Sequence, residues 1–536
     1  MRKSLIISFA LLAPSSQTYI WPSQHDQLDD LLYLQFGYIK DGTLSDQVAT
    51  CDFGAKQPGI QKAAEWVRTA FHDSVTYDAA TKTGGLDASV QYELDRPENL
   101  GAALNNTLAD ISSSVNIRSS AADLLALSLV MSVARCGKMR VPLRLGRKDA
   151  TEAGIKGVPE AHTDLATTRK RFETASLHEA DMITLIACGH SIGGVHSIDH
   201  PEIVPGAVSA EKKLSFDLTK GVLDNAVVLE YLDNSTSNPL IRNTNDTLNS
   251  DKRIFAADDN ATMKKLVDPA YFKSQCEAVF ERMLSLVPVE VTLTEPLEPA
   301  DIRPYITTYQ LASNGSVQFS GRLRVRVTPV TGRDQNNLTA SIILPSRNGS
   351  QATEIPARRA TYKGGMSSGY LDEAFSWFEF SQILNASEAF SSFNIRVNDI
   401  TYDNGGTGGY PINRDVLYQE AQSCVSFDAA ANQDTLGVTA AISKSLLGGG
   451  IAPQIRVVQR TKVQGNFIPR LKQVVVQMVR SSEETADYVY YTASTTIGAD
   501  SLSTTFDLEV GESNVEFINT GSISVRCTSL KDVKRT

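Results

Sequence analysis

The chain has 536 residues, of which 42% are hydrophobic and 21% are charged. Because single hydrophobic cores stop growing at about 250–300 residues, we expect two or three domains. The formal net charge of −10 and the sequence pI of about 5.4 argue against a phosphate-binding surface, so no nucleic-acid partner is expected.

The first twenty residues have the order of a secretory signal. Arg2 and Lys3 precede an apolar run over residues 5–12, and small and polar residues follow over 13–16. That run is too short to span a bilayer, and no later stretch is long and apolar enough to do so. We expect a signal peptide over residues 1–20, cleaved near residues 16–20, and a secreted protein with no membrane span.

Two further features agree with export. The six cysteines are an even number, which permits disulfides outside the cell. Asn-x-Ser/Thr sequons, which favour glycosylation in a secreted chain, begin at Asn105, Asn234, Asn245, Asn260, Asn314, Asn337, Asn348 and Asn385.

The pattern of apolar residues changes near Pro288. Before it, apolar residues recur at helical spacing over residues 63–71, 124–133, 182–192 and 272–286. After it, short alternating runs separated by turn residues predict strands over residues 317–327, 340–344, 455–458, 474–479 and 488–491.

This change predicts two main domains. We expect a mainly α domain over residues 22–288, a linker over 289–300, and an all-β, sandwich-like C-terminal domain over 301–536, built from one or two antiparallel sandwiches. All seven histidines precede Pro288, so imidazole chemistry belongs to the α domain.

A first candidate site lies in the helical segment over residues 61–74. Arg68 and His72 are four residues apart, so their side chains point the same way. The imidazole can move a proton between the two oxygens of a peroxide, while the guanidinium stabilises the charge on the leaving oxygen. Taken alone, this spacing more often marks a surface arginine and a half-buried histidine. Asp73 and the segment around Asp87 alter that balance, because they offer oxygen ligands of the kind that calcium takes.

The residues that follow carry a resemblance to a known family. The pattern R-x-x-F-H-D, G-G-x-D-x-S and E-x-x-x-P-E-N resembles the distal half of the plant and fungal haem peroxidases, above all the secreted fungal class II group. The resemblance implies that Asn99 accepts the N–H of the His72 imidazole, with Glu93 behind it and Phe71 as the distal aromatic residue. It also implies a distal calcium ion with the ligands Asp73, Gly85, Asp87 and Ser89.

A second helical segment carries the candidate iron ligand. A capping box over residues 176–179 predicts its start, and Gly193 and Gly194 predict its end. A lone histidine on an apolar helix is more often a buried core residue. The motif G-H-S-x-G around His190 nevertheless resembles the proximal motif of the same family, which implies that His190 is the axial ligand of haem b.

Two downstream segments resemble proximal features of the family. Phe216 would pack against the proximal face. Asp251 would accept a hydrogen bond from the far nitrogen of His190 and make the imidazole more electron-donating, although an N-cap role is the alternative. The resemblance also implies a second calcium ion with the ligands Ser191, Asp217, Thr219, Val222 and Asp224.

Several positions depart from specialised members of the family. Gln61, Glu65 and His196 stand where manganese-oxidising members have three acids, so a complete manganese site is not expected. Leu185 stands where ligninolytic members carry an exposed tryptophan, and Trp66 is expected to be structural. The histidines without a motif are expected at the surface (His25, His162, His178) or in loops or the pocket (His196, His200). Tyr77 and Tyr92 are expected to pack against other side chains, and the alternative is a role as surface electron relays.

The cysteines also depart in part from the family. Cys51 and Cys136 fit a disulfide found there. Cys188 is unusual and has Cys276 as a possible partner, while Cys424 and Cys527 are expected to close the β domain. Spacing alone does not fix this connectivity.

These residues predict a monomeric haem peroxidase with two calcium ions. It would reduce hydrogen peroxide and oxidise small aromatic or phenolic donors one electron at a time. The alternative is a secreted cell-wall or matrix-binding protein, in which the β domain binds a glycan or another cell-wall component on a peroxidase scaffold. The intact distal and proximal sets favour the enzyme. Core packing is expected for most of the aromatic residues that could form such a binding platform, namely Tyr305, Tyr309, Tyr370, Trp377, Phe378 and Phe380.

Overall fold

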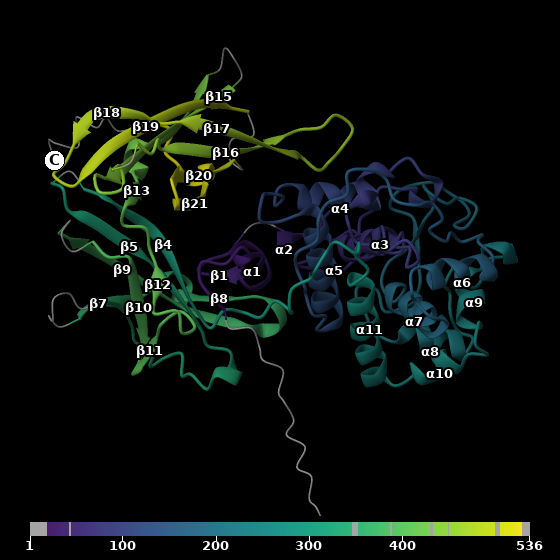
Figure 1. The fold of residues 1–536 in the computed structure, drawn as a ribbon. Coiled ribbons are helices and arrows are strands. Elements are labelled where there is room, and N and C mark those ends of the chain that lie inside the picture. Colours follow the sequence, from purple (N-terminus) through teal and green to yellow (C-terminus); the bar gives the residue numbers. More distant parts are fainter. Residues whose placement is uncertain are drawn as a thin grey trace, which may run out of the picture.

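The structure, a computed structural model, separates a helical half from a strand-rich half (Figure 1). It describes residues 19–41, 44–312, 314–345, 352–385, 389–428, 433–448, 450–498 and 504–527. Most of the expected signal segment, residues 1–18, lies outside the described residues. No helix in the described ranges has both the length and the apolar character needed to cross a bilayer. The expected fold class, helices followed by antiparallel sheets, is confirmed.

The helical half is built around α5, which is buried along almost its whole length. The Ser120 side chain caps this helix by accepting a hydrogen bond from the backbone N–H of Asp123. Helix α3 packs against α4 and α5, and α7 packs against α9 and α11. The helices are α1 (Asp26–Tyr33), α2 (Leu44–Gln47), α3 (Lys62–Ser74), α4 (Ala103–Ser112), α5 (Ala121–Gly137), α6 (Leu165–Thr174), α7 (Glu179–Gly189), α8 (Ala226–Leu232), α9 (Ser250–Phe255), α10 (Ala261–Lys265) and α11 (Pro269–Leu284).

The capping box expected over residues 176–179 is wrong in register. Ser176 adopts the left-handed conformation, with φ of 60°, and Leu177 N–H donates to the Phe172 carbonyl. These residues therefore close the C-terminus of α6, and α7 starts after His178, whose N–H donates to Asp181 at 3.2 Å. Helix α7 also ends earlier than expected, at Gly189, which makes His190 its C-cap residue.

The strand-rich half contains two β units. The first is a ten-stranded sheet of β1 (Phe36–Gly37), β4 (Ile302–Leu311), β5 (Val317–Arg326), β6 (Ala340–Leu344), β7 (Thr353–Arg359), β8 (Met366–Ser368), β9 (Ala374–Leu384), β10 (Ser392–Val397), β11 (Ile400–Tyr402) and β12 (Tyr410–Pro411). The second has a sheet of β13 (Val416–Tyr418), β14 (Cys424–Asp428), β15 (Gln433–Ser443), β18 (Val479–Glu484) and β19 (Tyr488–Ile497), and a sheet of β16 (Gln454–Thr461), β17 (Arg470–Gln477), β20 (Thr505–Val510) and β21 (Ser513–Asn519). The two sheets of the second unit share one apolar core, as a sandwich does.

The aromatic residues of the β half pack inward. Trp377, Phe378, Phe380 and Tyr370 are all buried. The indole N–H of Trp377 donates to Ser367 Oγ at 3.0 Å inside the core. Tyr305 and Tyr309 are half-buried beside them. These side chains therefore form no exposed binding platform, and core packing is confirmed for most of them.

The N-terminal segment, expected in the α domain, packs against both halves: Leu28, Leu31 and Leu32 join the helical core, and other residues of the segment contact the β half. Strand β1 pairs antiparallel with β8, and α1 lies beside the first β unit (Figure 1). The buried guanidinium of Arg303 donates to Asp29 Oδ1 at 2.8 Å and to Asp30 Oδ2 at 2.8 Å, and Arg324 is paired with the same two carboxylates. The contact with the β half forms because the carboxylates on one face of α1 pair with these two arginines, which belong to β4 and β5.

Two further contacts join the halves. The expected linker over residues 289–300 lies along the helical half, where Leu297 N–H donates to the Leu143 carbonyl at 2.7 Å. The loop between β16 and β17 extends toward the helices (Figure 1). There Ile468, only 5% exposed, enters the core of the helical half, and Asn466 Nδ2 donates to Gln91 Oε1 at 2.9 Å.

Three disulfides close the described cysteines. Cys51 pairs with Cys136 and Cys188 with Cys276, so that the first disulfide ties an N-terminal segment to α5 and the second ties α7 to α11. The third, Cys424–Cys527, closes the second β unit.

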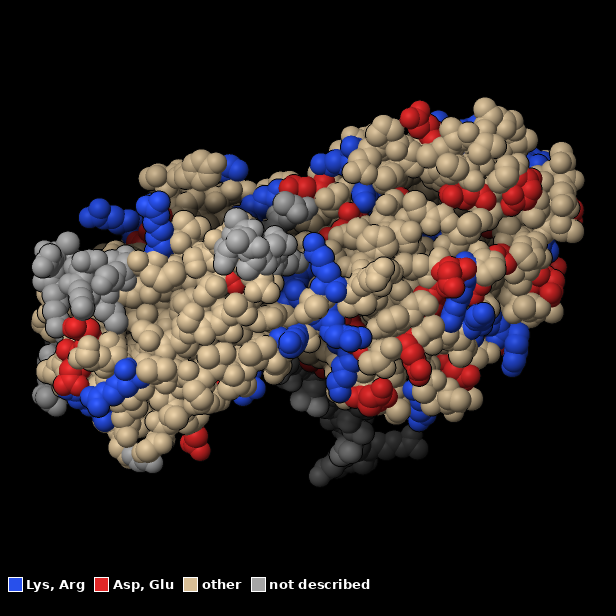
Figure 2. Space-filling model, turned by 90° about the horizontal axis from the view of Figure 1, so that it is seen from above, with Lys and Arg blue, Asp and Glu red and all other residues tan. Residues whose placement is uncertain are grey.

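Charged side chains are unevenly distributed over the face seen in Figure 2. Lysine, arginine, aspartate and glutamate are spread over the helical half and the junction, and they are sparse over the β half. This face of the β half therefore offers little charge to attract a polyelectrolyte.

Candidate functional site

A cavity of about 520 Å³ lies between α3 and the end of α7. Arg68 and His72 of α3 line one side, and His190, the C-cap residue of α7, lines it together with Phe216. The cavity also has apolar walls, formed by Val67, Leu185, Ile186, Leu240, Ile254 and Phe280. A large, mostly apolar cavity with a few convergent polar groups is the usual form of a cofactor site.

The distal side is a chain of hydrogen bonds. Arg68 Nε donates to His72 Nε2 at 3.3 Å, and His72 Nδ1 lies 2.7 Å from Asn99 Oδ1. Since Arg68 carries no acceptor, Nε2 must be the unprotonated nitrogen and Nδ1–H must donate to Asn99. Asn99 Nδ2 in turn donates to the backbone carbonyl of Glu93 at 2.9 Å. The chain leaves a basic nitrogen beside a guanidinium in the cavity.

The electrostatic surroundings keep His72 neutral. Burial and the nearby Arg68 guanidinium lower the pKa of His72 from 6.5 to about 3. Burial also lowers the pKa of Arg68, which nevertheless stays charged at any ordinary pH. Phe71 meets the edge of the His72 ring, with 5.9 Å between the ring centroids. The imidazole is therefore held as a base in a fixed orientation.

Glu93 supports this chain with its main chain. Its carboxylate accepts the Gly154 N–H at 2.6 Å and pairs with Arg96 at 2.9 Å. The side chain thus fixes the loop, and the backbone carbonyl holds Asn99.

The proximal side holds the second imidazole between a carboxylate and an aromatic ring. His190 Nδ1 lies 2.9 Å from Asp251 Oδ2, and Phe216 stacks on the ring with 4.1 Å between centroids and 14° between planes. Asp251 lies within α9, where its carboxylate faces His190 and does not cap the helix. Asn238 Nδ2 donates to the same oxygen, Asp251 Oδ2, at 2.9 Å. No sequence motif pointed to Asn238, because a lone asparagine in a loop carries no signal of its own.

These residues fit a haem. Both imidazoles line one cavity, and each has its Nδ1 engaged by Asn99 or Asp251. The unprotonated Nε2 of His72 faces Arg68, and Nε2 is the nitrogen that His190 has left for a metal. A carboxylate on the far nitrogen is the usual support of a metal-bound histidine, so His190 has the surroundings of an iron ligand. His72 has the surroundings of a base.

The distal oxygen-rich loop brings its expected ligands together. Asp73 accepts the backbone N–H of Asp87 at 2.9 Å, and Ser89 Oγ lies 3.4 Å from the same carboxylate. The Gly85 N–H donates to the Thr76 hydroxyl within this loop. Burial raises the pKa of both carboxyls, and Asp87 further raises that of Asp73. Two buried carboxylates that repel one another suit a cation between them.

The proximal loop is assembled in part. Thr219 Oγ1 lies 3.3 Å from Asp217 Oδ1 and 3.0 Å from Asp224 Oδ1. Burial, with Asp224 and Glu230, raises the pKa of Asp217 to about 7, and Asp217 Oδ2 has no hydrogen-bond partner among the described residues. Glu230 accepts the Leu218 N–H at 3.0 Å and was not expected from the sequence. Of the other expected ligands, Ser191 donates its hydroxyl to the Cys188 carbonyl, and the exposed Val222 donates its N–H to the Thr219 carbonyl within the loop.

Neither loop is a cluster of three or more acidic, histidine or cysteine ligands. The described part of the chain contains no such cluster arranged to hold a metal ion. The two calcium ions therefore stay predictions that depend on backbone and hydroxyl oxygens as well as on carboxylates.

The residues without an expected role in the site fall into three groups. His196, His200 and Leu185 line the cavity. Trp66 is fully buried and donates its indole N–H to Asp110 at 3.0 Å. The others lie away from the cavity: His162 and His178 are exposed, His25 and Tyr77 are half-buried, and Tyr92 is 41% exposed.

Comparison with known proteins agrees with this geometry. The family model described as peroxidase matches residues 51–270. Over 401 residues, 73% of this chain and 54% of the relative, the chain is 37% identical to a WSC domain-containing protein of Arthroderma benhamiae. This match is longer than the 288 residues that end at Pro288, so it extends into the strand-rich half.

Shorter matches, each over about a quarter of the chain, are to ascorbate peroxidases. The chain is 34% identical to peroxisomal L-ascorbate peroxidase 5 of Arabidopsis thaliana over 132 residues, 24% of this chain and 47% of the relative. It is 31% identical to L-ascorbate peroxidase 3 of the same plant over 134 residues, 24% of this chain and 46% of the relative. The chain thus spans about half the length of the curated relatives it matches. Residues 51–270 therefore form a helical domain of the plant, fungal and bacterial peroxidase superfamily, and a half rich in antiparallel strands follows it.

Proposed function

We propose that this protein is a secreted haem peroxidase that reduces hydrogen peroxide and oxidises small aromatic donors one electron at a time. The observation that carries the proposal is the pairing of two differently supported imidazoles in one cavity. His72 is a neutral base beside Arg68, and His190 is a histidine held by the carboxylate of Asp251. A protein that used this domain only as a scaffold would need neither arrangement.

The distal residues divide the work on peroxide. His72 Nε2 takes the proton from one peroxide oxygen and returns it to the other as the bond between them breaks. Arg68, already within 3.3 Å of that nitrogen, stabilises the negative charge on the leaving oxygen. Asn99 keeps the other ring proton on Nδ1, so that Nε2 stays free to accept. The low pKa of His72 lets this base act in acidic surroundings.

The proximal residues hold the cofactor. His190 would bind the haem iron through Nε2, while Asp251 and Asn238 fix its orientation and Phe216 covers one face of its ring. When bound, the haem would supply a redox-active centre, from which peroxide removes two electrons and to which donors return them one at a time. The apolar walls exclude water from this chemistry.

The proposed donors are organic molecules and not manganese ions. Gln61 is buried and accepts a hydrogen bond from the Lys213 ammonium at 2.6 Å. Glu65 is half-buried, and burial raises its pKa to about 7, which lowers its charge. The ammonium of Lys213 and the weakly charged Glu65 do not form a site for a divalent cation. This argues against manganese as the donor and supports aromatic donors.

Secretion is supported by features that tolerate or require an oxidising compartment. Three disulfides join the six cysteines, and none of the described sequon asparagines is buried, while Asn348 lies outside the described residues. Expression of the full chain with its N-terminus intact should give a secreted, glycosylated protein that begins near residues 16–20. Retention inside the cell would contradict this part of the proposal.

The peroxidase proposal is tested by the visible spectrum of the purified protein. We expect a Soret band that changes on addition of hydrogen peroxide. The variant His72→Leu should keep the band but react with peroxide about 10²–10⁴-fold more slowly, the usual contribution of a general acid–base residue.

A matched control uses a histidine outside the cavity. His162 is exposed, and His162→Leu should leave both the Soret band and its response to peroxide unchanged. A wild-type protein without a Soret band, or with a band that peroxide leaves unaltered, would refute the enzyme. Loss of haem from His72→Leu would make His72 a structural residue.

A further inference from the structure

The rim of the cavity carries a lysine that the proposed peroxide chemistry does not use. Lys213 begins β3 (Lys213–Ser215) and pairs in antiparallel register with His196, the last residue of β2 (Gly194–His196). Residues directly opposite in such a pair project from the same face of the ribbon. Both side chains line the cavity. The ribbon thus presents an ammonium and an imidazole side by side.

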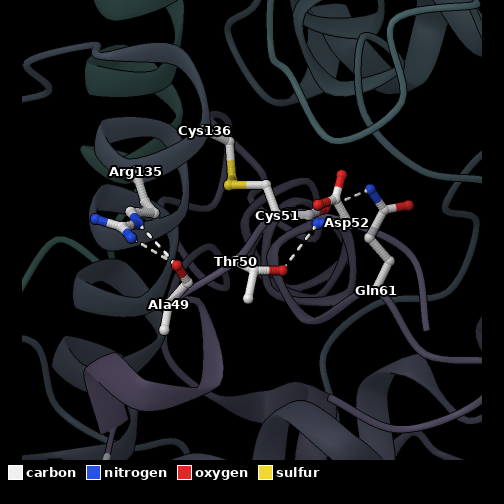
Figure 3. Close-up of a disulfide and its surroundings, with 7 residues drawn as sticks. All are labelled: Ala49, Thr50, Cys51, Asp52, Gln61, Arg135 and Cys136. Carbon is white, nitrogen blue, oxygen red and sulfur yellow. Dashed lines mark hydrogen bonds between the residues drawn. A yellow bond between two sulfur atoms is a disulfide. The ribbon is translucent and has the colours of Figure 1, made fainter. Parts of the chain in front are cut away.

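A disulfide-anchored segment holds this lysine in place. Lys213 Nζ donates to Gln61 Oε1 at 2.6 Å and to the Gly193 carbonyl at 3.2 Å. Gln61 Nε2 donates to the carbonyl of Cys51 at 2.8 Å, beside the disulfide to Cys136 (Figure 3). Because the amide nitrogen is engaged there, the amide oxygen is turned toward Lys213. Phe53, from the same segment, places its ring 4.5 Å from Nζ.

The ammonium lacks a counter-ion of its own. Among the described residues no carboxylate lies within 4.0 Å of Nζ, and its two hydrogen-bond acceptors are neutral. An ammonium has three protons to donate, so one donor remains. Burial, with the charge of Lys220, lowers the pKa of Lys213 to about 8. A half-buried cation at a cavity rim attracts anions more strongly than one in bulk water, because fewer waters screen it.

The neighbouring imidazole adds no competing charge. His196 Nδ1 lies 2.9 Å from the Ala210 carbonyl, and burial lowers the pKa of His196, with Lys213 and Arg68 lowering it further. The ring is therefore neutral, and its edge meets Phe53 with 5.5 Å between centroids. Lys213 thus stands beside a neutral ring and the apolar face of Phe53, while Asp199, which also lines the cavity, acts on His196 and not on Lys213.

We propose that Lys213, with His196 beside it, forms a carboxylate-binding subsite at the rim of the cavity. This rim subsite, Lys213 and His196 oriented by Gln61, would recruit aromatic donors that carry a carboxylate. The inference rests on the proposed function and narrows its donor class. The carboxylate could come from a donor or from a haem propionate, and the experiment separates these two sources.

The test measures equilibrium binding of benzoate and of neutral benzamide to the full-length, haem-loaded protein by titration calorimetry. Lys213→Gln should weaken benzoate binding about tenfold, the lower end of what a hydrogen bond to a charged group contributes, and should leave benzamide binding unchanged. Lys213→Arg should retain most of the affinity. Arg68 also lines the cavity, so dependence on Lys213, and not binding alone, is the measurement.

The matched control is the adjacent lysine. Lys212 lies outside the cavity lining and donates to the Pro205 carbonyl, so Lys212→Gln removes the same charge without touching the rim subsite. Haem retention is measured in parallel as the rate of haem transfer to an excess of apomyoglobin. Unchanged retention with weaker benzoate binding assigns the carboxylate to the donor. Faster haem loss with unchanged benzoate binding assigns it to a propionate.

The pH dependence gives an independent readout. Lys213 is charged below a pKa of about 8, and benzoate stays ionised above pH 6. Benzoate binding should therefore fall as pH rises through about 8, and this fall should be absent from Lys213→Gln. The charged groups that act on Lys213 are Lys220 and Asp217, and the lowered pKa of His196 keeps that ring neutral. The pKa of Asp217 is about 7, so its titration is shared by the wild type and Lys213→Gln, and the difference between the two proteins reports on Lys213.

The rim subsite is overturned if Lys213→Gln and Lys212→Gln have the same benzoate affinity and the same haem retention. Binding is read without turnover. A wild-type spectrum unaltered by peroxide would therefore end the proposed function, while Lys213-dependent benzoate binding would still establish the subsite.

Discussion

Replacing Asn99 by leucine tests whether the distal hydrogen-bond chain acts in the reaction or only in folding. The substitution keeps the approximate volume and removes the oxygen that accepts the His72 Nδ1–H at 2.7 Å. It also removes the donor to the Glu93 carbonyl. Asn99 is buried, so no bulk water takes its place.

The size of the effect follows from the charge that His72 acquires. When His72 takes the peroxide proton, its bond to Asn99 becomes a bond to a cation, which contributes about 1.5–3 kcal/mol. Loss of that contribution in the transition state should slow the reaction with peroxide about 10- to 100-fold. The unsatisfied Nδ1–H should also lower the free energy of unfolding by about 1–3 kcal/mol.

The assay is the rate of the peroxide-induced change in the Soret band, measured beside denaturant unfolding. The control is Asn404→Leu in the β half, where a buried asparagine bonds both backbone groups of Trp21. It should lower stability by at least as much, because leucine also disfavours the left-handed backbone of Asn404 at φ 62°, and it should leave the rate unchanged. The reasoning is wrong if Asn99→Leu, with haem bound, reacts at the wild-type rate, or if Asn404→Leu is slowed equally.

Two further predictions concern stability. Arg324→Met removes a wholly buried cation from Asp29 and Asp30 and should lower the free energy of unfolding by about 3–5 kcal/mol in denaturant titrations. The control is Arg322→Met on the same strand, where the side chain is 40% exposed and the loss should be about 1 kcal/mol or less. Similar losses in both variants would contradict the ion cluster. A calcium chelator should lower the Tm, because a bound cation would relieve the repulsion between the carboxylates of Asp73 and Asp87. Calcium should restore the Tm and magnesium should not, because calcium accepts irregular sets of oxygen ligands and magnesium does not. A Tm that does not respond to the chelator would leave that loop without a calcium ion.

The parts of the site that could be predicted are those whose residues are close in sequence. Arg68 and His72 are one helical turn apart, so a helical pattern alone places both side chains on one face. Asp251 could be named only through the resemblance, since it lies 61 residues from His190. The first pair thus follows from one helix, whereas the contact of Asp251 with His190 joins two helices and follows from no local pattern.

Residues that act across long distances in the chain carried no such signal. Asn238 supports Asp251 from a loop, and Lys213 reaches the cavity only because β3 pairs with β2. The sequence pattern of a three-residue strand is too short to predict that pairing. Glu230 likewise joins the proximal loop from α8, where its charge reads as an ordinary surface residue of a helix.

The placement of α1 shows the same limit at the level of whole domains. Its residues were expected within one α domain over residues 22–288, but a local pattern does not show which core a short helix packs into. Leu28, Leu31 and Leu32 are buried in the core of the helical half, while Asp29 and Asp30 pair with arginines of the β half. One short helix thus fixes both halves, and the segment that follows it leads to the disulfide that orients Gln61 and, through it, Lys213. The β half therefore supports the segment before α3, which in turn contacts the cavity lining through Gln61 and Lys213.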